Sequence, residues 1–289
     1  MTARTTGDLC GFTITNETSY GTTGTTKKFG GVLSTLETPS EETLDYDQGC
    51  GTRQWVNIVK TMESFGWTAD FTSITGTDWT DWFSYALGSL TGTISSSLTS
   101  FTALFRVASD EWMRSVGCKV DSMSVSADSF GSAVKFSVKA MAKRNTFTTT
   151  DQSSSAVARP TAKPIYYTSQ WERNGSPIPV KSWTLSIDNS LVGDPGVDNG
   201  EALAAGNGSI PSGNSNITLD LTVTSIGPTW DLLKQTGAEN DTLTLTLDGQ
   251  VITCSGCFLK TNFPKREQGM YDETISYIVK SITVEAEEI

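Results

Sequence analysis

The feature that most constrains the fold of this chain is an alternation of apolar and polar residues that recurs along its length. The clearest segments are 67–72, 134–142, 183–188, 217–224 and 243–247. Successive side chains of a β-strand point to opposite faces of the sheet, so this period of two predicts half-buried strands. The chain is also rich in Thr, Ser and Gly, which favours strands joined by turns over long helices. We therefore predict a mainly β fold, a sandwich or barrel with short flanking helices.

Only short segments depart from this pattern. Asp78 can cap a helix with apolar residues at helical spacing that ends at Gly88. Pro228 can open a second helix over 228–236. Segment 53–65 fits either a helix or a strand.

Two local signals concern the strands of the C-terminal half. The Asp-Gly pair at 248–249 lies between two apolar runs and predicts a two-residue hairpin turn. Near the C-terminus the apolar phase changes between Tyr277 and Ile282, which predicts a β-bulge near Lys280.

Composition excludes several functional classes. The chain has 289 residues, 37% of them hydrophobic, and a formal net charge of −11. That length and hydrophobic content can form a sizeable core, and the acidic balance opposes tight binding of nucleic acid. The sequence contains no His, which removes Ser-His-Asp and Cys-His catalysis and His-ligated zinc. We expect no enzyme activity and no cofactor.

The N-terminal residues show no apolar signal-peptide core, and no apolar run is long enough for a membrane helix. A soluble protein made in the cytoplasm is expected. The five cysteines are Cys10, Cys50, Cys118, Cys254 and Cys257. An odd number without an export signal favours reduced thiols. The Cys254/Cys257 pair could hold zinc together with Cys10 and Cys50, although buried apolar thiols in a strand are the simpler interpretation.

Four pairs of segments match in chain order and indicate an internal repeat. They are 33–37 with 185–189, 68–72 with 218–222, 117–118 with 256–257, and 138–141 with 279–282. Thr-rich strands resemble one another by chance, which is the alternative explanation. The conserved order, and a Trp-containing helix expected after the second match in each half, favour a tandem duplication.

This repeat leads to a predicted domain organisation. It consists of an N-terminal arm 1–30, a first β repeat 31–147, a linker 148–164 and a second β repeat 165–289. Each repeat contains one long acidic or Gly-rich loop, at 37–52 and 188–216. Loops of this length in a compact domain commonly serve an interaction. The acidic residues in them are Glu37, Glu41, Glu42, Asp45, Asp47, Asp194, Asp198 and Glu201. Those in the second loop could bind calcium, but they lack EF-hand spacing, and a solvated loop fits them better.

The order of features resembles the tail tube proteins of long-tailed, siphovirus-like bacteriophages and related archaeal tailed viruses. The residues that carry this resemblance are Tyr20-Gly21-Thr22, Ala86-Leu87-Gly88, the strand 182–189, the strand 217–224 and the helix 228–236. The likeness covers nearly the whole chain and depends on the order of elements rather than on one motif.

The resemblance implies a β-sandwich that contributes strands to a continuous barrel around a central channel. Such subunits commonly form homohexameric rings that stack into a tube, contact other tail proteins and let DNA pass without specific binding. The protein would be part of the virion tail, assembled in the host cytoplasm. Because this chain looks duplicated, we expect a homotrimeric, pseudo-sixfold ring; without a true repeat, the ring is a plain hexamer.

Two sets of residues follow as candidate sites. The polar sides of two strands share a Thr-Asp-Thr pattern and are predicted to line the lumen; they are Thr68, Asp70, Thr72, Thr218, Asp220 and Thr222. Rings of Asp would repel DNA phosphates and let the DNA slide. Solvent on the outer wall is the other possible environment for these faces. The loops 37–52 and 188–216, with the arm 1–30, are predicted to contact the adjacent ring.

Two rival interpretations remain open. Another virion β-protein, such as a baseplate or tail-completion subunit, would share the fold and form a single ring. A carbohydrate-binding or adhesin module would need exposed Trp, and the eight Trp of the chain allow this. The absence of an export signal argues against such a module.

Overall fold

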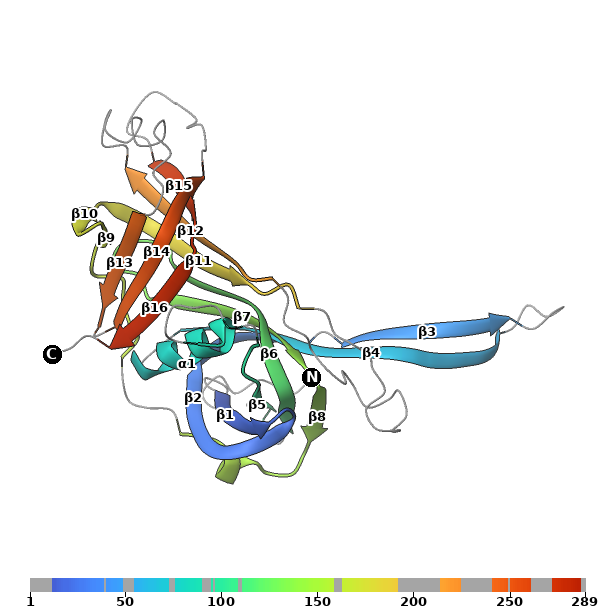
Figure 1. Ribbon diagram of the computed structural model, residues 1–289. Coiled ribbons are helices and arrows are strands. Elements are labelled where there is room, and N and C mark those ends of the chain that lie inside the picture. Colours follow the sequence, from blue (N-terminus) through green and yellow to red (C-terminus); the bar gives the residue numbers. More distant parts are fainter. Residues whose placement is uncertain are drawn as a thin grey trace.

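The computed structural model is an all-antiparallel β structure with one α-helix among its described residues (Figure 1). It describes residues 12–38, 40–48, 55–72, 76–89, 95, 97–108, 111–158, 163–191, 214–224, 241–248, 250–260 and 272–286. The first half contains β1 (Phe12–Ser19), β2 (Thr22–Glu37), β3 (Ser40–Gln48), β4 (Trp55–Thr72), α1 (Gly76–Leu87), β5 (Phe101–Ala108), β6 (Glu111–Ala127), β7 (Lys135–Ala142), β8 (Arg144–Thr148) and the 3₁₀ turn η1 (Ser153–Ser155). The second half contains β9 (Trp171–Arg173), β10 (Ser176–Ile178), β11 (Val180–Asp188), β12 (Asn216–Thr224), β13 (Asp241–Leu247), β14 (Gln250–Lys260), β15 (Asp272–Ile278) and β16 (Ser281–Ala286).

Eight strands form one long sheet that runs through both halves of the molecule. Their order is β2-β4-β7-β6-β11-β12-β15-β14. Two shorter flanking sheets are added to it. The first has the order β2-β1-β5-β6-β8, and the second has the order β10-β9-β13-β14-β16. Most buried apolar residues of the chain belong to one core, as expected for sheets that pack face to face.

The two halves repeat the same pairing order. We call the elements β1–β8 with α1 the first unit and the elements β9–β16 the second unit. In the long sheet, β2-β4-β7-β6 is followed by β11-β12-β15-β14. In the flanking sheets, β8 pairs with the first part of β6 just as β16 pairs with the first part of β14. The four strands that each unit adds to the long sheet therefore follow the same order, whereas β3 and α1 have no counterpart among the described elements of the second unit.

Matched glycines mark the bend at which a strand leaves the flanking sheet and enters the long sheet. Gly117 in β6 and Gly256 in β14 have φ angles of 64° and 61°. A Cβ on Gly117 would lie 2.6 Å from Cβ of Lys143, and one on Gly256 would lie 3.0 Å from Cβ of Lys280. A positive φ and a close neighbour both require glycine at these positions.

Strand pairing aligns the units differently from the sequence comparison at two places. Thr35 lies opposite Asp70 and Thr184 lies opposite Asp220, so residue 35 matches residue 184, an offset of 149 rather than 152. Lys143 follows β7 as Lys280 follows β15, an offset of 280 − 143 = 137 rather than 141. The earlier matches rested on residue type, which Thr-rich strands share at several registers.

Helix α1 confirms the first predicted helix, but it begins at Gly76, so Asp78 lies inside its first turn and is not the capping residue. It ends at Gly88, which has a φ of 73°, and buries Trp79, Trp82 and Phe83 completely. The indole Nε1 of Trp82 donates a hydrogen bond to the carbonyl oxygen of Gly30 at 2.9 Å, which ties the helix to β2. The second predicted helix, 228–236, lies outside the described residues.

The structure corrects two expectations from the sequence and decides a third that was left open. Residues 12–30, assigned to an N-terminal arm, form β1 and much of β2, with Phe12, Ile14 and Phe29 in the core. Segment 53–65 is resolved in favour of a strand, since β4 begins at residue 55. The phase change near Lys280 is a break between β15 and β16, where the chain moves from the long sheet to the second flanking sheet, rather than a bulge within one strand.

The acidic segment 37–52, expected as a loop, contains strand β3. Residues 40–48 pair with 55–65 of β4, and the resulting two-stranded ribbon projects from the body (Figure 1). This ribbon is hard to recognise in the sequence because an arm outside the core needs no continuous apolar face.

Candidate functional site: the polar face of the long sheet

The long sheet has a core face and a polar face. On β4 the residues Trp67, Ala69 and Phe71 are buried, and on β12 so are Leu219 and Leu221, while Thr68, Asp70 and Asp220, which alternate with them, are half-buried. One row across the polar face, given by the strand register, consists of Thr35, Asp70, Ser137, Ser124, Ser186 and Thr218. Small hydroxylated side chains therefore cover this face from β2 to β12.

The structure brings both predicted Thr-Asp-Thr sets to this same face. Asp70 lies on β4 and Asp220 on β12, with β7, β6 and β11 between them. The residues at positions 68 and 72 of β4, and 218 and 222 of β12, are half-buried beside them. The two sets are thus parts of one surface within a single chain. No sequence pattern could show that their strands belong to the same sheet.

Asp70 is held as a carboxylate. The hydroxyl of Thr35 donates a hydrogen bond to Oδ2 of Asp70 at 2.5 Å, and the hydroxyl of Ser34 donates to its backbone oxygen at 2.8 Å. Hydrogen bonds from Ser137 and Thr35 lower the pKa of Asp70 below its ordinary value. This position carries a negative charge across the physiological pH range.

The face also carries lysines, some of which lie beside a carboxylate. Nζ of Lys135 is 2.5 Å from Asp128, and Nζ of Lys139 is 2.8 Å from Asp121. The Lys181–Asp272 pair, with a separation of 2.5 Å, adds a third contact of this kind. Their positive charge is therefore compensated locally, which leaves Asp70 and Asp220 to contribute to the field of the face.

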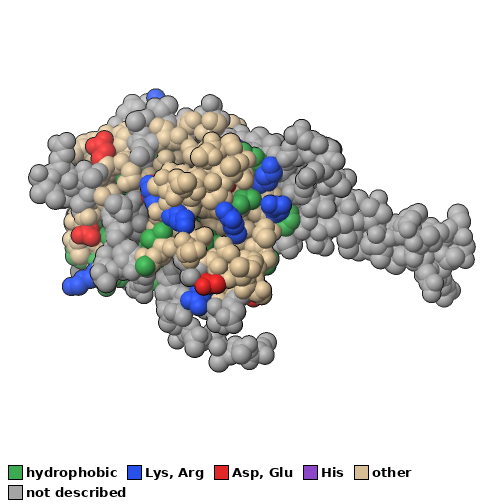
Figure 2. All heavy atoms as spheres, turned by 90° about the horizontal axis from the view of Figure 1, so that it is seen from below, with side chains coloured by type: hydrophobic (Ala, Val, Ile, Leu, Met, Phe, Trp, Pro, Cys, Tyr) green, Lys and Arg blue, Asp and Glu red, His purple; other side chains and the backbone are tan. Residues whose placement is uncertain are grey.

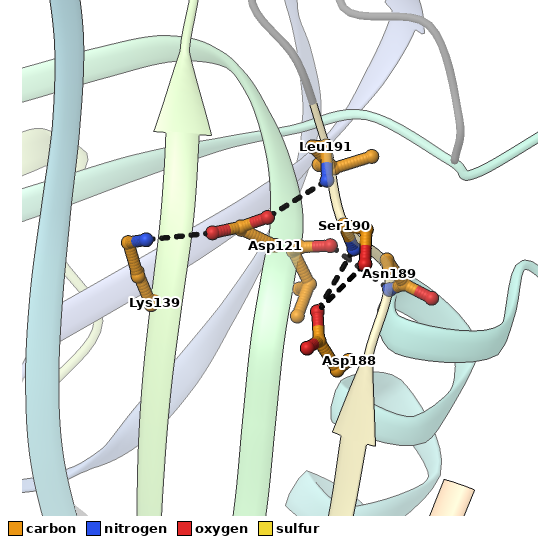
Figure 3. Close-up of polar contacts among 7 residues, drawn as sticks. Asp121, Lys139, Asp188, Asn189, Ser190 and Leu191 are labelled. Carbon is orange, nitrogen blue, oxygen red and sulfur yellow. Dashed lines mark hydrogen bonds and ion pairs between the residues drawn. The ribbon is translucent and has the colours of Figure 1, made fainter. Parts of the chain in front are cut away.

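The joint between the two units lies in the middle of the long sheet, where β6 pairs with β11. Asp121 sits at a register shift of β6 and is nearly buried. One of its carboxylate oxygens accepts a hydrogen bond from the backbone N–H of Leu191 at 2.9 Å, and the other lies beside Lys139 (Figure 3). The backbone oxygen of Asp121 accepts from the N–H of Asn189 at 2.8 Å.

Asn189 completes this joint from the end of β11. Its side-chain amide is buried and donates to the carbonyl oxygens of Ala86 and Val120, both at 2.9 Å. It therefore connects the C-terminal end of α1, strand β6 and strand β11. Ser215 donates to its Oδ1 at 2.5 Å.

Sequence reasoning did not identify Asp121 or Asn189. The available signal was a change of apolar phase in β6, from Val120 to Met123, with an acidic residue at the change. Such a change predicts a bulge, but it does not reveal what the bulged carboxylate contacts.

The predicted inter-ring residues fall into two groups. Glu37 is exposed at the end of β2, and the positions of Glu41, Glu42, Asp45 and Asp47 lie in β3, where only the backbone is described. Asp194, Asp198 and Glu201 lie outside the described residues.

The described cysteines have the environment of core residues. Cys118, Cys254 and Cys257 are free and buried. Burial raises the pKa of the Cys257 thiol to about 12, and the thiol donates to the backbone oxygen of Cys254 at 3.3 Å. Among the residues that the structure describes, no group of His, Cys, Asp and Glu could hold a metal ion. Cys10 and Cys50 lie outside them.

One face of the molecule shows several basic side chains (Figure 2). Seen from the side on which Figure 1 places β2 and β8, Lys and Arg side chains gather on the described surface (Figure 2). No helix in the described ranges is long and apolar enough to cross a membrane.

Comparisons with known proteins give no assignment. No protein-family model matches the chain, and no curated protein sequence matches it.

Proposed function

We propose that this chain is a structural, non-enzymatic virion protein that polymerises as stacked rings into the tail tube of a tailed virus. The observation that carries this proposal is the long sheet, whose polar face extends from β2 of the first unit to β12 of the second while its other face lies on the core. A wall of a channel needs such a surface, because it must be wetted on one side and held rigid on the other.

We propose further that the chain is a tandem duplication and supplies two tube repeats. The equal pairing order of the two units and the matched glycines at 117 and 256 support this. Each unit adds four strands to the long sheet, so three chains would supply the wall that six single-repeat subunits supply in a hexamer.

The polar face then lines the lumen. Asp70 and Asp220 repeat around the channel, and the neighbouring lysines are compensated by Asp128 and Asp121. A surface of hydroxyls and carboxylates gives DNA phosphates no array of free cations to bind. DNA would pass during genome delivery without being retained.

The β3–β4 ribbon is proposed to contact the adjacent ring. Both of its outer edges can accept a further strand, and a soluble monomer ordinarily avoids such edges. Of the described residues, 55–64 of β4 pair only with β3, so the ribbon contributes no strand pairing to the body of its own chain. Its length and projection suit a contact with a neighbouring subunit (Figure 1).

Negative-stain electron microscopy of the purified, concentrated protein tests the proposal. We expect long hollow tubes of constant diameter. Closed rings that do not stack would favour the baseplate or tail-completion alternative, and a monomer at every concentration would overturn both.

A variant with a shortened ribbon tests whether the ribbon is the contact between rings. Residues 43–62 can be replaced by Asn-Gly, because Glu42 and Glu63 are paired in the hairpin register. This variant should keep the fold and the rings but lose the tubes. If it still forms tubes, the ribbon is not the inter-ring contact.

A further inference from the structure

The joint inside the chain shows how one unit attaches to the next. Residues 122–127 of β6, the last strand of the first unit in the long sheet, pair antiparallel with 183–188 of β11, the first strand of the second unit. The contact is head-to-tail, since it joins two different edges of two equivalent units.

The same two kinds of edge recur at the ends of the long sheet. Within the described part of the chain, residues 32–37 of β2 pair only with β4, and residues 258–260 of β14 pair only with β15. By strand order, β2 is the counterpart of β11, and β14 is the counterpart of β6. The internal joint pairs a β6-type edge with a β11-type edge. The long sheet therefore has one edge of each type at its two ends: β14 corresponds to β6, and β2 corresponds to β11.

The burial of counterpart residues indicates that the β2 edge lacks a neighbour. In β11, which has β6 beside it, Trp183 and Leu185 are 2% and 1% exposed. In β2, Leu33 and Leu36 point to the same core but are only partly buried. A strand added beside β2 would complete their burial.

The β14 end leaves apolar side chains uncovered. Phe258 and Ile278, which pair across β14 and β15, are 40% and 45% exposed. The counterpart of Ile278 in the first unit is Met141, which packs against a small cluster containing Leu191. Leu191 follows β11, so at the internal joint a residue of the second unit belongs to the cluster that packs against Met141 of the first unit.

Charge at the two ends is complementary. Glu37 is exposed at the β2 end, and Lys260 is exposed at the β14 end, on the polar side of the sheet. In the internal register the counterparts of these positions are diagonal neighbours across the joint. An acidic and a basic side chain at this separation favour the head-to-tail order over either end meeting its own copy.

We propose that copies of this chain join by pairing the β14 end of one copy with the β2 end of the next, antiparallel and in the arrangement of the internal β6–β11 joint. The long sheet then continues from chain to chain, and a head-to-tail contact of this kind forms a ring when the rotation between successive copies closes. The inference names the partner and the edges for the proposed ring. It rests on the proposed function only in taking the ring to be part of a tube.

Cross-linking tests the pairing. In a Cys10→Ser, Cys50→Ser background, Glu37→Cys and Lys260→Cys are combined, and the assembled protein is treated with a short bismaleimide. We expect covalent dimers and larger species on a denaturing gel. Pairing Glu37→Cys instead with Asp248→Cys, an exposed residue at the β13–β14 turn, should leave the protein largely uncross-linked.

Single-cysteine variants fix the direction of the contact. Glu37→Cys alone and Lys260→Cys alone should give no dimer, whereas a mixture reassembled from both should give dimers and nothing larger. If the cross-links form in rings that do not stack, the proposed β14–β2 joint is supported and the proposed tube is contradicted. Tubes without the Glu37–Lys260 cross-link, or a protein that stays monomeric, would overturn the joint.

Discussion

The two units of the chain pair their strands in the same order but fill their cores differently. On β4 the core face carries Trp67, Ala69 and Phe71, whereas the counterpart positions on β12 are Ile217, Leu219 and Leu221. The aromatic rings of the first unit contact one another, for example Trp67 with Phe105 at a centroid distance of 5.1 Å. The core face of β4 thus alternates large and small side chains and that of β12 is uniformly aliphatic, yet both strands occupy the same place in the strand order. The topology therefore follows from the period-two pattern and the bends rather than from particular core side chains.

The largest expected difference between the units is the cost of a core truncation. Trp67→Ala removes a fully buried indole and should lower the free energy of unfolding by about 3–5 kcal/mol. Ile217→Ala, the counterpart change, should cost about 2–4 kcal/mol because a smaller cavity is left. Chemical denaturation monitored by circular dichroism measures both. Equal losses would show that the aromatic core is not the more strongly stabilised of the two.

The second-largest loss of stability is expected for a substitution at the joint between the units. Asn189→Ala leaves the buried carbonyl oxygens of Ala86 and Val120 without their donor, so a loss of about 2 kcal/mol is expected. Ser190→Ala, at the exposed neighbouring residue, serves as the control and should cost less than about 0.5 kcal/mol. A biphasic transition in Asn189→Ala would sharpen the comparison further, since it would mean that the units unfold separately once the joint is weakened.

The matched glycines test the equivalence of the bends. Gly117→Ala and Gly256→Ala both place a Cβ at a positive φ, which costs about 1–2 kcal/mol. The first should be the more destabilising, because its Cβ would approach Cβ of Lys143 to 2.6 Å, against 3.0 Å from Lys280 for the second. Melting temperatures of the two variants provide the measurement. An unchanged melting temperature for either variant would show that its bend does not require glycine.

The smallest effect concerns the polar face. Because hydrogen bonds depress the pKa of Asp70 in the folded state, its stabilising contribution is present above its ordinary pKa of 3.8 and is lost as pH falls below that value. Asp70→Asn should therefore cost less than about 0.5 kcal/mol near neutral pH, and the difference from the parent should shrink as pH falls below 3.8. Stability measured against pH, with Asp220→Asn as the matched change on β12, checks this. A difference that grows as pH falls would contradict the assignment.

Much of the fold could be predicted because the alternating segments are long. The strands around Phe136, Trp183 and Leu219 follow from period two, and the end of α1 follows from Gly88. The order of strands in the sheets could not be predicted, since any of these polar faces can pair with any other. That order decides whether Asp70 and Asp220 share a surface.

The parts that sequence reasoning missed have identifiable physical causes. The segment 40–48 contains four acidic residues and only two large apolar or aromatic ones, and the strand at 12–19 was obscured by its position next to a segment without periodicity. The contacts of Asp121 depend on a residue 70 positions away, which local patterns do not report.

A cryo-electron microscopy reconstruction of the assembled protein tests the central claim most directly. We expect a tube in which the long sheets of successive chains close around the channel, with Asp70 and Asp220 facing the lumen in every ring. An assembly in which both carboxylates lie on the outer wall would contradict the account.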